Sequence, residues 1–205
     1  MGTFGQYTGR ARKAFTPAFW AWFGDSVMRD ADGTPTVFYH GTGAKVRFTA
    51  FMDWRPAFFT PDKEYTKTYV YKGGGRARVI PVYLRIERPF DPSRDEEARR
   101  FYNEQFIPFW REKYPRQSED KNFAPLEKGE TLYYFYADQF WSFLRRWTRE
   151  HGPSYDGLIV DEGEGWSKHP AYVPLYPWQI KAARGNRGTF DPADPDILHG
   201  LSRRR

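Results

Sequence analysis

The chain contains no cysteine, and this absence excludes several kinds of site at once. Without thiols there is no disulfide framework, no thiolate zinc site and no cysteine nucleophile. Long apolar runs are also missing, since none approaches the roughly 18 residues that a membrane-spanning helix requires. The N-terminus lacks the pattern of a secretory signal peptide. We therefore expect a cytoplasmic protein that is not secreted and does not contact a membrane.

Other familiar sites are equally hard to place. The three histidines His151, His169 and His199 are scattered and have no carboxylate at metal-ligand spacing, so we expect no metal. The chain has no Gly-x-Ser-x-Gly elbow, which removes the usual basis for a serine hydrolase. Its glycine run at residues 73–75 precedes a predicted strand rather than a helix, which is the wrong context for a phosphate-binding loop.

Aromatic residues are abundant, at 20% of the 205 residues, and supply ample material for a core. This length favours one domain. A formal net charge of +6 is compatible with an anionic partner such as nucleic acid or a dinucleotide. The basic residues are nevertheless interspersed with 26 acidic ones, apart from the arginine run at 203–205, and a solvated basic surface accounts for them equally.

Strand and helix patterns alternate irregularly along the chain, which predicts an α+β fold. We expect a loose basic leader over residues 1–15, a domain over 16–196 and a basic tail over 197–205. Within the domain, helical patterns over 95–114 and 138–150 predict a helical insertion at about 91–150. A further helix is expected after Pro61.

The most informative stretch is residues 38–42, an apolar run that ends in His-Gly-Thr. Such a run predicts a buried strand, and Gly41 directly after His40 leaves the backbone open to a ligand. Two further aromatic residues, Phe58 and Tyr69, offer faces on which a flat heterocycle can stack. Core packing of both rings is the alternative interpretation of the same residues.

Several motifs occur in an order that resembles the phage-type ADP-ribosyltransferases, on the diphtheria-toxin and poly(ADP-ribose) polymerase side of that superfamily. The motifs cover about residues 16–196 and match least over 91–150; they are Trp-Phe-Gly-Asp-Ser at 22–26, Phe-Tyr-His-Gly-Thr at 38–42, Phe-Phe-Thr-Pro at 58–61, Tyr-Asp-Gly at 155–157, Gln-Ile-Lys at 179–181 and Gly-Asn-Arg-Gly-Thr-Phe-Asp-Pro at 185–192. The resemblance implies an ADP-ribosyltransferase fold, with a split, mostly antiparallel sheet around an NAD cleft.

The resemblance also implies roles for individual residues. His40 matches the histidine that bonds the ribose next to adenine, and Gly41 the residue whose backbone holds the nicotinamide carboxamide, with Thr42 supporting that loop. Phe58 and Tyr69 match the pair of rings that flank nicotinamide, eleven residues apart.

Thr66 matches a hydroxyl residue that bonds the carboxamide. NAD would then be the substrate, and no metal is implied.

One position departs from this pattern. The family places a glutamate before the strand that leads to Gln-Ile-Lys, and the corresponding residue here is Ala171. That glutamate bonds the ribose and stabilises the positive charge that develops as nicotinamide leaves; losing such a group typically costs on the order of 10²–10³ in rate. Either Glu162 or Glu164 takes over this role, or alanine has been substituted for a natural glutamate, or the domain binds NAD without catalysis.

The predicted function is therefore NAD-dependent mono-ADP-ribosylation by a phage-encoded effector or toxin. Its acceptor would be a host macromolecule, either protein or nucleic acid. The alternative is a catalytically inactive phage protein that binds NAD or nucleic acid, using the basic tail at 203–205.

Overall fold

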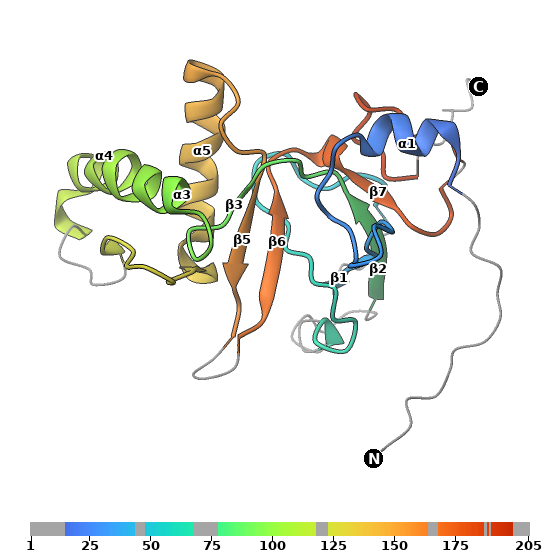
Figure 1. Cartoon of the computed structure of the whole chain (residues 1–205), viewed down its shortest axis with the longest axis horizontal. Coiled ribbons are helices and arrows are strands. Elements are labelled where there is room, and N and C mark those ends of the chain that lie inside the picture. Colours follow the sequence, from blue (N-terminus) through green and yellow to red (C-terminus); the bar gives the residue numbers. More distant parts are fainter. Residues whose placement is uncertain are drawn as a thin grey trace, which may run out of the picture.

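The computed structural model describes residues 15–43, 48–67, 78–117, 123–163, 168–186, 188 and 190–198. It is a mixed α+β structure in which two small sheets lie side by side, with helices at the outer side of each (Figure 1). Most of the predicted leader and of the predicted basic tail, including the arginines at 203–205, lies outside the described residues.

The first sheet is antiparallel throughout and has the order β1-β2-β7. Its strands are β1 (Phe38–Thr42), β2 (Arg78–Leu84) and β7 (Ile180–Ala182). In the register of β1 and β2, His40 lies opposite Ile80. The strand predicted from the His-Gly-Thr run is therefore present, and it holds His40 near the middle of its length.

The second sheet is built around β5 (Gly157–Asp161), which pairs with three strands. Two of them, β3 (Pro89–Phe90) and β4 (Leu132–Tyr133), run parallel to it, whereas β6 (Pro170–Pro174) runs antiparallel. The expectation of a mostly antiparallel core holds for the first sheet and for the β5–β6 pair, with β3 and β4 as the parallel additions.

A short segment at residues 57–60 connects the two sheets. Tyr39 and Thr60 exchange backbone hydrogen bonds of 2.8 and 3.1 Å on the side of the first sheet. Phe59 and Tyr172 do the same at 3.0 and 2.7 Å on the side of the second. The backbone N–H and C=O groups in these two pairs of residues are thus hydrogen-bonded to each other, as buried backbone groups require. This segment therefore fixes how β1 faces β6.

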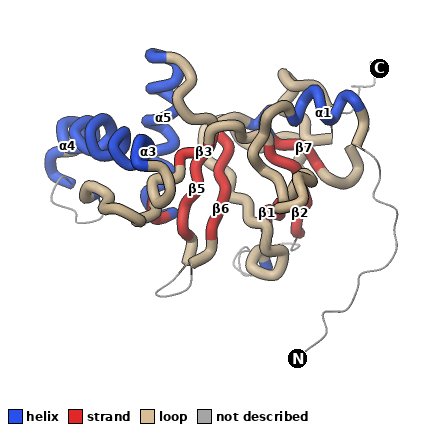
Figure 2. The backbone as a smooth tube through the Cα atoms, in the orientation of Figure 1, coloured by secondary structure: helices blue, strands red, loops and turns tan. Residues whose placement is uncertain are grey.

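Helices cover the outer side of each sheet (Figure 2). Beside the first sheet lies α1 (Pro17–Phe23), capped by Thr16, whose hydroxyl accepts a bond from the Phe19 backbone amide. Beside the second lie α3 (Glu96–Phe101), a π-helical turn (Tyr102–Phe106), α4 (Ile107–Lys113) and α5 (Ala137–His151). The helices predicted over 95–114 and 138–150 are thus present. The helix predicted after Pro61 begins as turns over residues 63–66, and most of the rest lies outside the described residues.

Gln179 ties the two sheets together where β2 ends and β5 begins. The residue is fully buried. Its side-chain amide donates to the carbonyls of Arg85 (2.7 Å) and Asp156 (2.8 Å), and its oxygen accepts from the backbone amide of Tyr176 (2.8 Å). Arg85 follows β2 and Asp156 precedes β5, so one side chain joins both sheets. The glutamine of the Gln-Ile-Lys motif is structural here.

Lys181, in the same motif, has a comparable role. Its ammonium group donates to the carbonyls of Asp194 (2.6 Å) and Asp196 (3.0 Å), which holds the C-terminal segment against β7. Burial lowers the pKa of Lys181, an effect that the nearby carboxylates of Asp194 and Asp191 oppose. The motif thus fastens the fold rather than entering a cavity.

We predict that Gln179→Leu lowers the free energy of unfolding by about 3 kcal/mol, because three buried backbone groups lose their partners. Gln139→Leu is the matched control, since the buried oxygen of Gln139 has no hydrogen-bond partner among the described residues. We expect the control to change stability by less than about 1 kcal/mol. Urea denaturation of both variants measures this; equal losses would contradict a special role for Gln179.

Candidate active site

His40 projects from β1 into the space between the sheets and is fixed by the bridging segment. Its Nδ1 lies 2.9 Å from the carbonyl oxygen of Phe58. A carbonyl only accepts hydrogen bonds, so Nδ1 carries the proton and Nε2 of the neutral ring remains an acceptor. The rings of Phe51 and Phe59 lie 5.1 and 5.4 Å from the imidazole, centroid to centroid.

Burial lowers the pKa of His40 below its ordinary value of 6.5. The hydrogen bond to Phe58 opposes this shift, and the nearby positive charge of Arg55 reinforces it. The imidazole is therefore neutral at pH 7. Its free Nε2 is suited to accept a hydrogen bond from a hydroxyl group.

Two cavities meet at His40 and Phe58. The smaller has a volume of about 120 Å³ and is lined by Tyr39, His40, Gly41, Phe58, Phe59, Thr60, Thr66 and Glu162. Backbone from β1, rings from the bridging segment and one carboxylate side chain thus surround a single hollow. The combination of an apolar ring face with a few polar groups is typical of a small-ligand site.

Close packing beside this cavity requires a glycine at position 41. A Cβ built on Gly41 would overlap the backbone carbonyl oxygen of Thr66. Thr66 is itself buried, and its hydroxyl donates to the carbonyl of Lys63 at 2.6 Å. The absence of a side chain at 41 lets segment 63–67 lie directly against β1, which closes one wall of the cavity.

Glu162 is the acidic residue of the small cavity and is only 7% exposed. It follows directly after β5, and its backbone is held from both sides. Its amide donates to the carbonyl of His169 (2.9 Å), and its carbonyl accepts from the hydroxyl of Tyr65 (2.9 Å). The ring of Tyr65 stacks on His169 with centroids 4.1 Å apart. The backbone of Glu162 is thus fixed by these two bonds, and the residue lines the hollow.

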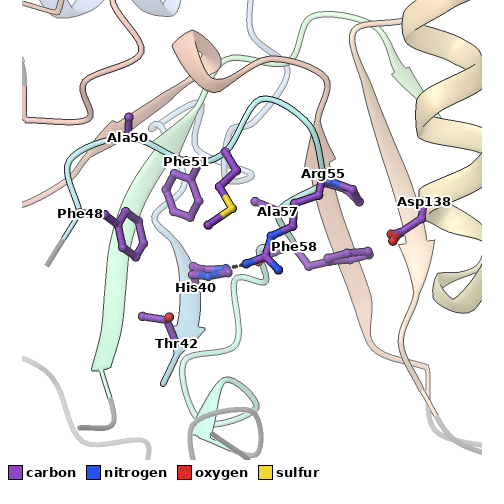
Figure 3. Close-up of a pocket in the computed structure, with 11 residues that line it drawn as sticks. His40, Thr42, Phe48, Ala50, Phe51, Arg55, Ala57, Phe58 and Asp138 are labelled. Carbon is purple, nitrogen blue, oxygen red and sulfur yellow. Dashed lines mark hydrogen bonds between the residues drawn. The ribbon is translucent and has the colours of Figure 1, made fainter. Parts of the chain in front are cut away.

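The larger cavity, of about 400 Å³, opens on the other side of His40 and Phe58. Figure 3 shows its wall of apolar side chains, among them Phe48, Phe51 and Ala57. Arg55 extends across it toward His40, and Asp138 faces it from α5 (Figure 3). Partial burial raises the pKa of Asp138, and the charge of Arg55 counteracts that rise.

The loop that carries Arg55 is fastened to α5. Asp53 pairs with Arg145 of α5, oxygen to nitrogen at 2.8 Å. The guanidinium of Arg145 in turn lies over the rings of Trp141 (4.6 Å) and Tyr176 (4.8 Å). Such stacked cation–π contacts orient the arginine. Helix α5, through Asp138 and Arg145, therefore helps to shape the larger cavity.

The structure brings together most of the residues predicted for the site. His40, Gly41, Phe58 and Thr66 all line the small cavity, and Thr42 lines the larger one. Tyr69 lies outside the described residues, and so does Glu164. The pairing of Phe58 with Tyr69 therefore stays a prediction.

Ala171 is placed elsewhere. It lies in β6 opposite Val160, is fully buried and belongs to the core beneath α5. Among the described residues, the walls of the two cavities do not include it. Its assignment to the position of a catalytic glutamate stays a prediction that rests on the resemblance.

Sequence reasoning missed two charged residues of the larger cavity, Arg55 and Asp138. Arg55 lies in a stretch without strand or helix pattern, and Asp138 looks like an ordinary first-turn acid of a surface helix. Within the described residues no group of three or more potential metal ligands gathers, and no helix is long and apolar enough to cross a bilayer.

Comparison with known proteins identifies the family. A family model described as "ADP-Ribosyltransferase in polyvalent proteins" matches residues 30–190, which is most of the chain. The chain therefore belongs to the ADP-ribosyltransferase family of polyvalent proteins. No curated protein and no solved structure matches it. The matched residues include both cavities and the helices α3, α4 and α5.

We predict that Gly41→Ala displaces segment 63–67 and lowers the free energy of unfolding by about 1–3 kcal/mol, the usual cost of overpacking. The clash is with a backbone oxygen, so no side-chain rotation relieves it. A crystal structure of the variant and a denaturation curve test this. Unchanged stability together with an unmoved Thr66 carbonyl would contradict it.

A pH titration tests the neutral state of His40. NMR of the imidazole should give a pKa below 6.5, the ordinary value. Because the unfolded chain then binds the proton more readily, the free energy of unfolding should fall as pH falls from 6.5 toward the folded pKa. His40→Gln should remove this part of the pH dependence. A folded pKa above 6.5 would refute the assignment.

Proposed function

We propose that the paired cavities bind NAD and that the chain transfers the ADP-ribose group of NAD to a macromolecular acceptor. Membership of an ADP-ribosyltransferase family implies an NAD-dependent transferase. The geometry beside β1 supports the same reaction. The residues that line the two cavities include an aromatic ring, an imidazole, a glycine backbone and a glutamate, which are the groups that this reaction needs.

The small cavity suits the nicotinamide end. In our proposal the ring lies on Phe58, and the carboxamide is held by the backbone of Gly41 with the hydroxyl of Thr66 nearby. An amide needs one donor and one acceptor in fixed positions, which a strand backbone without a side chain provides. The tight contact of Gly41 with Thr66 gives this wall its rigidity.

His40 and the larger cavity suit the adenosine half. The free Nε2 of His40 accepts a hydrogen bond from a ribose hydroxyl, in agreement with the role implied by the resemblance. The larger cavity offers aromatic faces for a base, and its volume of about 400 Å³ lies in the range of ligand sites. Arg55 supplies a positive charge between the two hollows.

Glu162 is the residue that we propose to drive the reaction. The bond between nicotinamide and ribose breaks, nicotinamide leaves with the bonding electron pair, and positive charge develops on the ribose. A carboxylate fixed beside the ribose stabilises that charge. The acceptor then forms the new bond to the same ribose carbon, and its displaced proton passes to the carboxylate of Glu162 or to solvent.

One observation carries this proposal: the buried Glu162 shares a small hollow with His40, Gly41 and Phe58. A carboxylate this well covered is rare unless it has a structural or chemical role. Its backbone is held by bonds to His169 and Tyr65, and the residue lines the cavity. We place the catalytic glutamate at 162, directly after β5.

The alanine at 171 favours a second candidate, a domain that binds NAD without transferring ADP-ribose. In either case we propose that the protein acts as a phage-encoded effector on a host macromolecule. A toxin role is part of the same proposal, and the acceptor is protein or nucleic acid.

We predict that Glu162→Gln lowers the rate of NAD cleavage by about 10²–10³, because the amide no longer carries the negative charge. NAD affinity should change little, since the amide keeps the shape of the side chain. Release of nicotinamide in single-turnover assays measures the rate, and calorimetry measures binding.

Glu164→Gln is the matched control, a neighbouring carboxylate changed in the same way. We expect it to retain full activity. Two outcomes would overturn the assignment of Glu162: a loss of rate in Glu164→Gln alone, or a gain of activity in Ala171→Glu together with an unaffected Glu162→Gln. NAD binding without cleavage by any of these chains would favour the second candidate.

A further inference from the structure

A separate pocket lies beside the first sheet. It has a volume of about 310 Å³, and its walls include Tyr39 from β1, Tyr83 from β2, Lys63 from the segment after the bridge and Arg184 from the residues after β7. Four stretches that are distant in sequence thus place two hydroxyls and two cations around one hollow. The apolar part of the wall comes from Val37, Val79 and Pro81.

The cations of this pocket are available to a ligand. Lys63 and Arg184 are exposed, and within the described part of the chain neither forms an ion pair. The other arginines near the sheets differ: Arg85 pairs with Glu87, and Arg145 pairs with Asp53. The walls of the pocket contain no carboxylate among the residues described.

The two tyrosines add neutral donors. Neither hydroxyl is hydrogen-bonded within the described residues, and the tyrosines are half-buried. Burial raises the pKa of Tyr83, and the proximity of Tyr39 raises it further, so the hydroxyl of Tyr83 keeps its proton at neutral pH. The pocket therefore presents hydroxyl donors together with an ammonium and a guanidinium.

This donor set selects a particular ligand chemistry. A guanidinium and an ammonium that face one hollow attract an anion. Additional hydroxyl donors on other walls suit a tetrahedral group with several acceptor oxygens, such as phosphate, better than a planar carboxylate with two. The volume exceeds that of one phosphate, which leaves room for the attached sugar.

We propose that this pocket binds the phosphate group of a nucleotide or nucleic-acid strand, at a site separate from the NAD cleft. The pocket adjoins the cleft through Tyr39, which also lines the small cavity, and through the segment that carries both Lys63 and Thr66. A phosphate held there lies beside the cavity that contains Glu162. The site does not depend on the proposed turnover of NAD.

Binding of inorganic phosphate, followed by NMR chemical shifts, tests the site directly. Wild-type chain should bind saturably, and Lys63→Gln combined with Arg184→Gln should weaken binding by about tenfold or more, because two charge-assisted bonds are lost. Arg111→Gln combined with Lys128→Gln removes the same charge from exposed positions of the insertion and should stay within about twofold. Tyr83→Phe should weaken binding by a smaller factor.

Two further binding measurements identify the molecule that carries the phosphate. A short single-stranded oligonucleotide and adenosine monophosphate are compared on the same variants. For the oligonucleotide, the slope of log affinity against log salt should fall by about 0.7 for each lost contact. Tighter binding of the oligonucleotide assigns the site to nucleic acid, and tighter binding of the monophosphate assigns it to nucleotides.

Several results would overturn the proposal. They are a lack of saturable phosphate binding, an equal loss in the two double variants, and a parallel loss of NAD affinity in Lys63→Gln/Arg184→Gln. The last result would assign the cations to the phosphates of NAD. NAD affinity that remains within about twofold while phosphate binding falls tenfold supports a second site.

Discussion

The two cavities depend on residues 57–60, which form backbone hydrogen bonds with both sheets. Backbone pairs from Thr60 to β1 and from Phe59 to β6 set the separation of the sheets, and the carbonyl of Phe58 fixes the imidazole of His40. The same three residues therefore position a ring face, an imidazole tautomer and the two strands that carry the rest of the site. Each bond is buried backbone or nearly so, where an unpaired group is costly.

A second set of hydrogen bonds joins the two sheets where β2 ends and β5 begins. Gln179 joins the residue after β2 to the residue before β5, and Asp156 accepts the backbone amides of Glu87 and Arg88 at 2.8 Å each. The pKa of Asp156 is nevertheless raised, because the cost of burial outweighs those two bonds. The two sheets are thus joined at two places, by residues 57–60 and by the bonds around Gln179 and Asp156. This arrangement explains why several family motifs contain residues that never reach the cavities.

Much of this could be predicted from the sequence because it is local. The apolar run at 38–42 gives a strand, Thr16 and Pro17 begin a helix, and the apolar stripe of α5 packs on the second sheet. His40, Gly41, Phe58 and Thr66 could be grouped because motif order resembled a known family. Local patterns fail where partners meet only in three dimensions: Arg55 and Asp138 share a cavity although they come from a loop and a distant helix.

The position of the proposed catalytic glutamate is the hardest part of the site to predict from sequence spacing. Counting back from Gln179 leads to Ala171, which the structure buries in the core of the second sheet. Glu162 follows β5 directly, lies opposite His169 in the same hairpin, and lines the small cavity. The role that we propose for Glu162 depends on its contact with Tyr65, which no sequence pattern marks.

The most direct measurement is a crystal structure of the chain soaked with nicotinamide. Our account predicts the pyridine ring against Phe58 in the small cavity, with its carboxamide on the backbone of Gly41 and the carboxylate of Glu162 beside the ring nitrogen. Nicotinamide bound elsewhere at saturating concentration, with this cavity unchanged and Glu162 turned away from it, would contradict the account.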